Sequence, residues 1–430
     1  MNTSDKVLII GSGVAGMDAA LMLSKAGKKV ILVEKLALTG GKTIKNEETY
    51  PNLDCSTCLV APIQQEILQD SNIELLTLST VEKVDGYEGN FNVTINKVAR
   101  YINAEACLGC HMCYDPCPVV IKNEWEENLI DRKAVYVPCT GALPNVPRVQ
   151  AEHCLKLNGQ DESCSKCVDA CMFAAFDFSQ KDEKVDVEVS GIIVATGYEL
   201  LDVAEIEELG YGKFKGVYTS LEFERLFASN GPTEGALTLR GSDVSPETIA
   251  IIHCVGRDKT GYCSSVCCMS SSKHAHFIKH KLPDVKIYNI YSDLCLADKT
   301  YQKFNDKVSK ESSEFIFQTD RNKMKITETG DKLSVSYVNK EEKEDSLTVD
   351  MVVLASALVP PKNIEELTNI LDIERDEFGF IAVEPHKIGS VETSRAGIFV
   401  AGCAEGPKDI QSSVLQAEAA VAGILSFPVE

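Results

Sequence analysis

The chain has 430 residues, of which 44% are hydrophobic and 25% charged, and its formal net charge is −21. This composition predicts a globular protein of two or three domains, and the acidic excess argues against nucleic-acid binding, which needs basic patches. No run of about 18 apolar residues is present, so no membrane span is predicted, and Met1–Asp5 lead into a strand without a secretory signal. Seventeen cysteines without an export signal predict a reducing, cytoplasmic location, where thiols act as ligands or catalysts.

The N-terminal segment has the pattern of a dinucleotide-binding unit. The apolar run Val7–Ile10 predicts a buried parallel strand, followed by the loop Gly11-Ser12-Gly13-Val14-Ala15-Gly16 and a helix over Met17–Ala26. Glycines at these spacings allow a tight turn, close approach of the backbone to a pyrophosphate, and packing of the helix on the strand. A second apolar strand, Val30–Val33, ends at Glu34, a carboxylate placed to bind an adenosine ribose. The order of these features favours a nucleotide site over a glycine-rich structural turn.

Later segments favour FAD as the nucleotide. Gly40-Gly41 follows soon after Glu34, a pattern that resembles flavoproteins with two dinucleotide domains, of the thioredoxin-reductase type. Residues 191–197 and 397–402 look like strands that return to the first domain. Cys403 stands where that class has Asp. We therefore expect Asp409 or backbone groups to contact the ribityl chain of FAD, and we interpret Cys403 as a buried thiol without a redox role. The predicted FAD-binding residues are Gly11, Gly13, Val14, Ala15, Gly16, Glu34, Lys35, Gly41, Lys42, Thr196, Gly197, Gly402, Cys403, Asp409 and Ile410.

Between about residues 101 and 178 the pattern becomes that of a bacterial ferredoxin with two clusters. The first cysteine run has the spacing C-x2-C-x2-C-x3-C-P, and in such proteins the fourth cysteine ligates the other cluster. The second run is irregular, because nine residues separate its first two cysteines and Met172 stands where Pro is expected. Zinc is the alternative, which two interlocking four-cysteine sets disfavour. One [4Fe–4S] cluster is assigned to Cys107, Cys110, Cys113 and Cys171, and the other to Cys117, Cys154, Cys164 and Cys167.

A third cysteine group replaces the expected loop of a second nucleotide domain. The strand Thr248–His253 would precede a G-x-G-x-x-G loop in a pyridine-nucleotide domain, but cysteines follow it instead. We therefore predict a third cluster and no NAD(P)H site, with a redox disulfide as the competing interpretation. His274, His276 and His280 lie on the next predicted helix and are interpreted as a solvated face. The predicted ligands are Cys254, Cys263, Cys267 and Cys268.

Distinctive stretches along nearly the whole chain resemble the A subunit of heterodisulfide reductase (HdrA) and its relative QmoA. The resemblance implies FAD, an inserted ferredoxin domain with two clusters, and a further [4Fe–4S] cluster near the flavin. It also implies that Lys273 lies beside the isoalloxazine ring as the catalytic group, where a positive charge stabilises reduced flavin. The stretches are Asp54-Cys55-Ser56-Thr57-Cys58, Arg132-Lys133-Ala134-Val135-Tyr136, Ser220-Leu221-Glu222-Phe223-Glu224-Arg225, Gly231-Pro232-Thr233-Glu234-Gly235, the Cys254–Cys268 segment and Gly406-Pro407-Lys408-Asp409-Ile410.

The chain departs from the longer family members in several ways. It is expected to lack their extra N-terminal domain and their C-terminal ferredoxin domain. In this expected shortness the chain resembles QmoA. Cys295 stands where the family is expected to have Arg. Cys55 and Cys58 are candidates for ligands, a redox pair or packed thiols, and packed thiols are preferred.

The predicted fold is α/β, a thioredoxin-reductase-like flavoprotein with an inserted two-cluster ferredoxin domain. The predicted function is an FAD and iron–sulfur electron-transfer subunit of a heterodisulfide-reductase-type complex, which splits two-electron flavin chemistry into one-electron steps, with bifurcation or confurcation as an option. The expected partners are HdrB-like and HdrC-like subunits and an electron-donor module, with a homodimer and membrane association through partners as options. The alternatives are a QmoA-like subunit of a quinone-linked membrane complex, an NAD(P)H-dependent oxidoreductase, and a non-catalytic assembly module. The predicted segments are 1–100, 179–240 and 351–430 for the FAD domain with a linker, 101–178 for the ferredoxin insert, and 241–350 for the second nucleotide-like domain.

Overall fold

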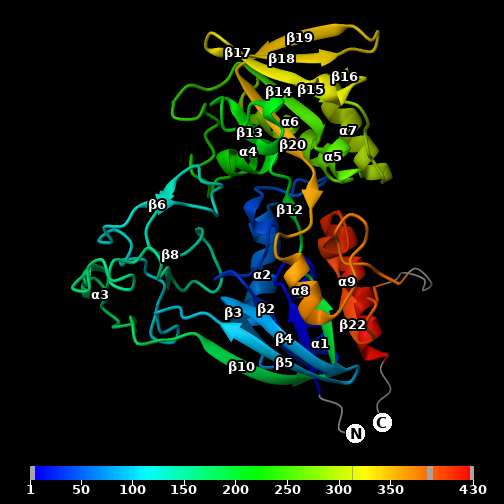
Figure 1. Ribbon diagram of the computed structural model, residues 1–430. Helices are drawn as coiled ribbons and strands as arrows, with labels where there is room; N and C mark the ends of the chain where they lie inside the picture. The colour runs from blue at the N-terminus through cyan, green and yellow to red at the C-terminus, as the bar shows by residue number, and fades with distance from the viewer. Residues whose placement is uncertain (1–4, 312, 385–390, 427–430) are drawn as a thin grey trace.

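The computed structural model describes residues 5–311, 313–384 and 391–426 (Figure 1). Residues 1–4, from which the absence of a secretory signal was inferred, lie outside this part of the chain. Two five-stranded sheets form the centres of two domains, one above the other in Figure 1, and a loop-rich segment projects to the left. No helix in the described part of the chain is both long enough and apolar enough to cross a membrane.

The first sheet is parallel throughout, with the strand order β22-β11-β1-β2-β3. Helices cover one of its faces, and a three-stranded antiparallel sheet with helix α8 covers the other, so the central residues of its inner strands are apolar on both faces. The strands are β1 (Lys6–Ile10), β2 (Lys29–Glu34), β3 (Ile73–Thr77), β11 (Gly191–Val194) and β22 (Ile398–Val400), the antiparallel strands are β4 (Ser79–Tyr87), β5 (Asn90–Lys97) and β10 (Glu183–Val189), and the helices are α1 (Val14–Lys25), α2 (Ser56–Gln69), α8 (Ile364–Leu371) and α9 (Ile410–Leu425).

The second sheet repeats this arrangement, with the parallel order β13-β20-β14-β15-β16. Three helices pack on one face, and an antiparallel sheet of three strands packs on the other. Its elements are β13 (Val217–Thr219), α4 (Ser220–Phe227), β14 (Thr248–Val255), α5 (Arg257–Thr260), α6 (Cys267–Lys281), β15 (Lys286–Tyr291), α7 (Lys299–Glu311), β16 (Glu314–Phe317), β17 (Lys325–Thr329), β18 (Lys332–Val338), β19 (Glu344–Val349) and β20 (Met351–Ser356).

The chain returns to the first domain later than expected. Strand β20 falls in the segment 351–430 that was predicted for the FAD domain, but it pairs with β13 and β14 in the second sheet. Strand β13 and helix α4 also belong to this second body, although they fall in the predicted linker. The crossing is made instead by a two-stranded ribbon of β12 (Glu199–Leu200) and β21 (Leu358–Val359). A buried parallel strand has the same apolar pattern in either sheet, so the sequence could not assign it.

The inserted segment is held together mainly by loops. Its two ends meet where Ile102 and Phe176 form an isolated β-bridge, so the chain leaves and re-enters the first domain at one place. The guanidinium group of Arg225 on α4 binds the carboxylate of Glu126 in a buried ion pair, at 2.8 Å, which links the insert to the second domain. The regular elements of the insert are β6 (Ile121–Lys122), β7 (Asp131–Arg132), β8 (Val135–Tyr136), β9 (Arg148–Val149) and α3 (Lys166–Asp169).

Candidate functional site

The glycine loop after β1 leaves no room for larger side chains at two of its three glycines. Gly11 has φ +105°, and an added Cβ would lie 2.4 Å from the carbonyl oxygen of Ala195. A Cβ at Gly16 would lie 1.9 Å from the carbonyl oxygen of Gly11, so the helix can approach the strand only through glycine. At Gly13 a Cβ would meet nothing within 4 Å. The loop therefore packs closely against its own domain at Gly11 and Gly16. The space that a side chain at Gly13 would enter is open, as the predicted pyrophosphate site requires.

Replacing Gly13 with alanine is expected to weaken FAD binding without unfolding the protein. The added methyl group meets no protein atom, but it enters the space predicted for the pyrophosphate. We expect a loss of about tenfold or more in FAD affinity, about 1.4 kcal/mol, measured by flavin absorbance during titration of the apoprotein. Unchanged affinity, with an unchanged melting temperature, would contradict the placement of the phosphates.

Glu34 lies at the end of β2 with its side chain fixed by local hydrogen bonds. Its carboxylate accepts bonds from the backbone N–H and the hydroxyl of Ser12, at 2.9 and 2.7 Å, and from the N–H of Leu36 at 2.8 Å. An ionised carboxylate has about four acceptor positions, so one stays available for a ribose hydroxyl. The fixed orientation of this buried group fits the predicted ribose contact.

Other predicted FAD residues surround the ends of β11 and β22, next to the glycine loop. The buried hydroxyl of Thr196 has no hydrogen-bond partner among the described residues, which fits contact with a bound group. Asp409 caps α9 through the N–H of Ser412 at 2.7 Å and accepts a bond from the hydroxyl of Tyr301, so about two of its four acceptor positions stay available. Val14 and Ala15 start α1, Gly41 and Gly402 lie against the glycine loop, and Gly197 adopts φ +73°. Cys403 donates to the carbonyl of Lys408, and Lys42 donates to the carbonyl of Tyr198. Lys35 and Ile410 are exposed.

The inserted segment contains two cavities, and each is lined by four cysteines. Each cavity has a volume of about 20 Å³. Cys117 belongs to the first cysteine run in sequence, but it lines the cavity of the second set, while Cys171 lines the cavity of the first set. The first cavity is lined by Cys107, Cys110, Cys113 and Cys171, and the second by Cys117, Cys154, Cys164 and Cys167. The two groups coincide with the two predicted ligand sets, including the irregularly spaced Cys154.

Each of the two cavities is lined by four thiols, which is the number of protein ligands that a [4Fe–4S] cluster takes. The backbone N–H of Gly109 also donates to the sulfur of Cys107 at 3.4 Å, the type of bond that tunes an iron–sulfur centre.

The third cysteine group comes together where β14 ends and α6 begins. The sulfur atoms of Cys254 and Cys268 lie 3.9 and 3.7 Å from the same acceptor, the carbonyl oxygen of Asp293. The pKa of the buried Cys267 thiol is raised well above its usual value by a hydrogen bond with Cys268 and by burial, with further contributions from Cys254 and Cys263. All four predicted ligands therefore lie in one region. Cys295 joins them, because its N–H donates to the sulfur of Cys268 at 3.4 Å.

Lys273, the predicted catalytic residue, lies at the junction of the two domains. Its side chain is 2% exposed, and its ammonium group lies 2.9 Å from both carboxylate oxygens of Glu224. It also donates to the carbonyl oxygen of Glu48, on the loop that follows the double glycine of the first domain, at 2.9 Å. Burial alone would raise the pKa of Glu224, but Lys273 and His274 outweigh it and lower this pKa to about 2. The structure thus holds a buried ion pair where the sequence predicts a single cation.

The prediction of a solvated histidine face is wrong for His274. This side chain is 1% exposed, its Nε2 lies 2.6 Å from the carboxylate of Glu224, and its ring packs edge-on against Phe223 and Phe227. Burial lowers the pKa of His274, so the ring is neutral near pH 7. Only His280 of the three is exposed. Glu224 had no role in the sequence analysis, although the structure buries it with the other five of the last six residues of α4.

The Lys273–Glu224–His274 network predicts loss of stability in acid. The folded pKa is lower than the unfolded pKa for Glu224 and also for His274, so the unfolded state binds more protons. Stability from His274 is present above about pH 6.5 and is lost below it, and that from Glu224 is lost as the pH falls from about 4.5 toward about 2. The Glu224 contribution amounts to about 3 kcal/mol at most. Melting temperatures between pH 7 and pH 3 should fall more steeply for the wild type than for Glu224→Gln, and parallel curves would contradict the assignment.

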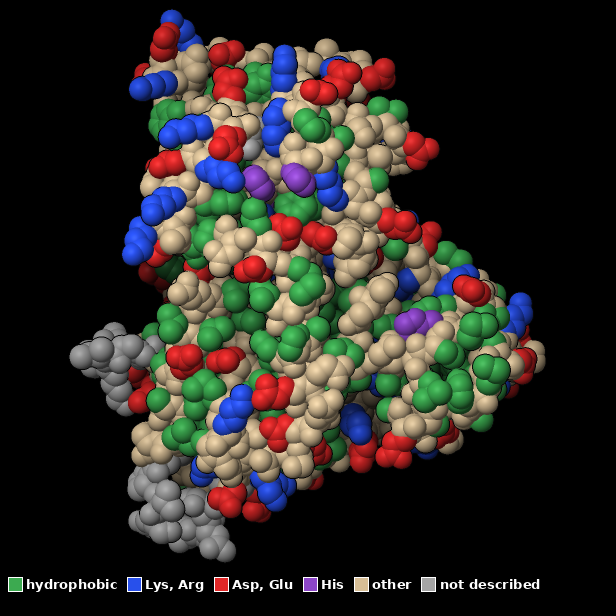
Figure 2. Space-filling model, turned by 180° about the vertical axis from the view of Figure 1, so that it is seen from behind, with side chains coloured by type: hydrophobic (Ala, Val, Ile, Leu, Met, Phe, Trp, Pro, Cys, Tyr) green, Lys and Arg blue, Asp and Glu red, His purple; other side chains and the backbone are tan. Residues whose placement is uncertain are grey.

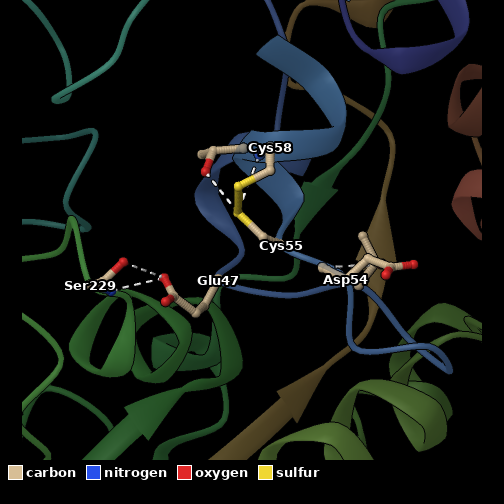
Figure 3. Close-up of a disulfide and its surroundings, with 7 residues drawn as sticks. Glu47, Asp54, Cys55, Cys58 and Ser229 are labelled. Atoms are coloured by element: carbon tan, nitrogen blue, oxygen red, sulfur yellow. Dashed lines mark hydrogen bonds between the residues drawn. A yellow bond between two sulfur atoms is a disulfide. The ribbon is translucent and has the colours of Figure 1, made fainter. Parts of the chain in front are cut away.

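Cys55 and Cys58 form a disulfide at the start of α2, so the preference for packed free thiols is wrong (Figure 3). Nearby, the carboxylate of Glu47 accepts bonds from the N–H and hydroxyl of Ser229, at 2.8 and 3.1 Å, which connects this loop to the second domain. Glu48 forms an isolated β-bridge with Cys55 and also offers its carbonyl to Lys273. The disulfide is therefore adjacent to the loop segment that contacts the buried ion pair.

The fold and the glycine loop define the class of the protein. The sequence profile of the pyridine nucleotide-disulphide oxidoreductase family matches residues 5–420, so the chain belongs to this family of oxidoreductases. A thioredoxin reductase from Lactococcus lactis has a TM-score of 0.54 and 17% identity, with 98% of each chain covered. The flavoprotein disulfide reductase RclA of Escherichia coli, as the Cu(II) complex of a cysteine-to-serine mutant, has a TM-score of 0.53 and 13% identity, with 99% of this chain and 71% of that one covered. The predicted fold class is confirmed.

Within this family the chain resembles proteins named for heterodisulfide reduction, as predicted from its motifs. It is 38% identical to the A subunit of the H(2):CoB-CoM heterodisulfide,ferredoxin reductase of Methanothermobacter marburgensis, over 98% of this chain and 64% of that protein. It is also 38% identical to the second iron-sulfur A subunit of the CoB–CoM heterodisulfide reductase of Methanopyrus kandleri, with the same coverage. The chain thus spans slightly less than two thirds of the length of these relatives, and the resemblance to HdrA is confirmed.

Proposed function

We propose that this chain is an FAD- and iron–sulfur-containing electron-transfer subunit of a heterodisulfide-reductase-type complex. FAD would exchange electrons in pairs, and three [4Fe–4S] clusters would carry them singly, with bifurcation or confurcation as one form of this splitting. The observation that carries the proposal is the separation of eight cysteines into two cavities of four. A ferredoxin-type pair of sites inside a flavoprotein fold is what such an exchange requires.

The residues of the first domain would hold FAD. The glycine loop and the start of α1 would bind the pyrophosphate, and Glu34 would bind the ribose of the adenosine. Thr196 would contact the part of FAD that carries the flavin ring. Asp409, which keeps acceptor positions besides its cap and its bond with Tyr301, or backbone groups of α9 would contact the ribityl chain. Cys403 remains a bystander in this proposal, because its thiol is buried and donates to a backbone carbonyl.

Exposed apolar side chains on the insert support docking of a partner protein close to the first cysteine cavity. Leu108, Met112 and Met172 are 69, 60 and 82% exposed, and Leu108 and Met112 also line the cavity. Figure 2 shows hydrophobic side chains gathered on the projecting insert. Apolar contacts around a site that lies near the surface would bring a partner's redox centre close to it. We propose HdrB-like and HdrC-like subunits as the partners on this side.

Anaerobic isolation of the chain from its native source tests the proposal. We expect about one FAD and about twelve iron atoms per chain, together with inorganic sulfide. Dithionite should bleach both the flavin and the cluster absorbance, whereas clusters silent to reductants would indicate a non-catalytic assembly module. A colourless preparation would contradict the proposal.

Adding NADPH to the isolated protein distinguishes the proposed function from that of an NAD(P)H-dependent oxidoreductase. The loop after β14 has cysteines and a short helix, α5, where a pyridine nucleotide would need a glycine loop, so flavin absorbance should stay unchanged. Rapid bleaching would favour an NAD(P)H-dependent oxidoreductase instead. Proteins that co-purify complete the test, since a thiol–disulfide subunit indicates the heterodisulfide type and a haem-bearing membrane subunit indicates the QmoA type.

A further inference from the structure

The third cysteine group contains a fifth thiol, Cys295, which the predicted ligand set leaves out. Cys295 lies in the loop between β15 and α7, and its backbone N–H donates to the sulfur of Cys268 at 3.4 Å. Ser265 contacts two of the thiols, because its N–H donates to the sulfur of Cys263 at 3.4 Å and its hydroxyl bonds with the thiol of Cys295. The thiols of Cys295 and Cys263 also bond with each other. A [4Fe–4S] cluster takes four protein ligands, so one of the five thiols is in excess.

The five thiols differ in how deeply they are buried. Cys254, Cys267 and Cys268 are 8, 8 and 1% exposed, whereas Cys263 and Cys295 are both partly exposed. Cys263 lies on the loop between α5 and α6, while two of the buried thiols begin α6 and the third lies in β14. The two partly exposed thiols therefore lie next to each other, on the side of the group that is nearest to solvent.

A fifth thiolate beside four thiolate ligands is unfavourable. Like charges in a partly buried site oppose the ionisation of a further group, so a thiol that does not ligate iron stays neutral. A neutral thiol is a weak hydrogen-bond donor, and the bond between Cys295 and Cys263 points this donor at the sulfur of the predicted ligand. Cys295 is therefore placed to exchange with Cys263, and its charge state does not favour a fifth bond to iron.

We propose that Cys295 is a reserve ligand, which takes the place of Cys263 when that sulfur leaves the iron. The inference rests on the proposed function, in which the third cysteine group holds a [4Fe–4S] cluster. In the exchange the bond from Cys263 to iron breaks, the bond from Cys295 to the same iron forms, and the thiol proton of Cys295 moves to Cys263. No electron is gained or lost, and four thiolates ligate the iron atoms before and after. Cys295 thereby retains the iron atom whose original ligand is closest to solvent.

Alanine variants of the anaerobically isolated protein test the exchange, since alanine cannot ligate iron. Cys263→Ala should keep about twelve iron atoms per chain, whereas the double variant that also carries Cys295→Ala should lose about four. Cys267→Ala is the matched control, because the hydrogen-bond partner of this buried thiol is Cys268, and it should lose about four iron atoms although Cys295 is present. Iron analysis and electron paramagnetic resonance of the reduced protein measure these losses. The flavin content and the two signals of the insert report whether each variant is folded.

Alkylation of the folded wild type gives a readout that needs no substitution. Tryptic cleavage after Lys286 and Lys299 releases the peptide 287–299, in which Cys295 is the one cysteine. Iodoacetamide should modify Cys295 in the wild type while about twelve iron atoms per chain remain bound. In Cys263→Ala the same cysteine should react about tenfold or more slowly, because its sulfur then ligates iron and is no longer a free thiol.

Three results would overturn the reserve ligand and leave the proposed function standing. Cys263→Ala could lose about four iron atoms with Cys295 intact, which would show that Cys295 does not reach the iron. Alkylation of Cys295 in the wild type, or Cys295→Ala alone, could remove about four iron atoms, which would make Cys295 a resident ligand. Equal rates of alkylation in the wild type and in Cys263→Ala would show that no exchange occurs. A wild type with about eight iron atoms would instead contradict the third cluster of the proposed function, and the reserve ligand with it.

Discussion

A Cys117→Ser variant is expected to lose one cluster and to keep the cluster ligated by its own sequence neighbours. Cys117 ends the run that supplies Cys107, Cys110 and Cys113, but it lines the other cavity, together with Cys154, Cys164 and Cys167. Loss of one of four thiolate ligands should remove about four iron atoms per chain. Iron analysis and electron paramagnetic resonance of the reduced protein would measure this loss and identify the remaining signal.

The matched variant is Cys171→Ser, from the second run. Its thiol lines the cavity of Cys107, Cys110 and Cys113, so it should remove the signal that Cys117→Ser leaves and leave the one that Cys117→Ser removes. The double variant should then lose both signals. If Cys117→Ser and Cys113→Ser removed the same signal, each run would hold its own cluster and the crossed assignment would be wrong.

The sequence predicts these crossed ligands because covalent spacing restricts them strongly. Cysteines separated by two residues must lie on one tight loop, so the first three can ligate the same cluster. The fourth cysteine, which precedes proline, ligates the other cluster in proteins with such a run. The glycine loop is predictable for the same reason, since Gly11 and Gly16 leave no space for a Cβ in any protein that packs this way. Steric and covalent constraints act over a few residues and are therefore visible in a single chain.

Long-range contacts are not visible in this way. Glu224 meets Lys273 and His274 across 49 and 50 positions, and nothing near any of the three in sequence predicts the others. A lysine and a histidine on a helix suggest a solvated face, and only the packing of α6 against α4 makes them a buried pair of donors. The disulfide was missed for another reason, because the spacing of Cys55 and Cys58 suits a ligand pair, a redox pair and two packed thiols equally well.

Removing Lys273 is expected to cost stability and also to lower the flavin potential. Lys273→Met leaves the buried carboxylate of Glu224 without its cation, and breaking a buried pair from one side typically costs about 3–5 kcal/mol. The resemblance to HdrA also implies that this charge lies beside the flavin, and on that prediction the midpoint potential should fall by tens of millivolts, with about 30 mV equivalent to 1.4 kcal/mol for two electrons. Denaturant titration and spectroelectrochemistry measure the two effects separately. Lys279→Met on the same helix is the control, because among the described residues its ammonium group binds the backbone carbonyl of Val285 and no carboxylate.

Glu224→Gln distinguishes the charge of Lys273 from its packing. This variant keeps the shape of the side chain but leaves the ammonium group uncompensated, so the potential should rise where Lys273→Met lowers it. The double variant removes both charges, and its loss of stability should be smaller than the sum of the single losses, because neither group then stays buried without a partner. Unchanged potentials in both single variants, with the expected losses of stability, would leave the pair a structural link between the domains and remove Lys273 from the flavin site. Opposite shifts in potential require the pair to act on the flavin through its charge, since packing defects would not change sign with the charge removed.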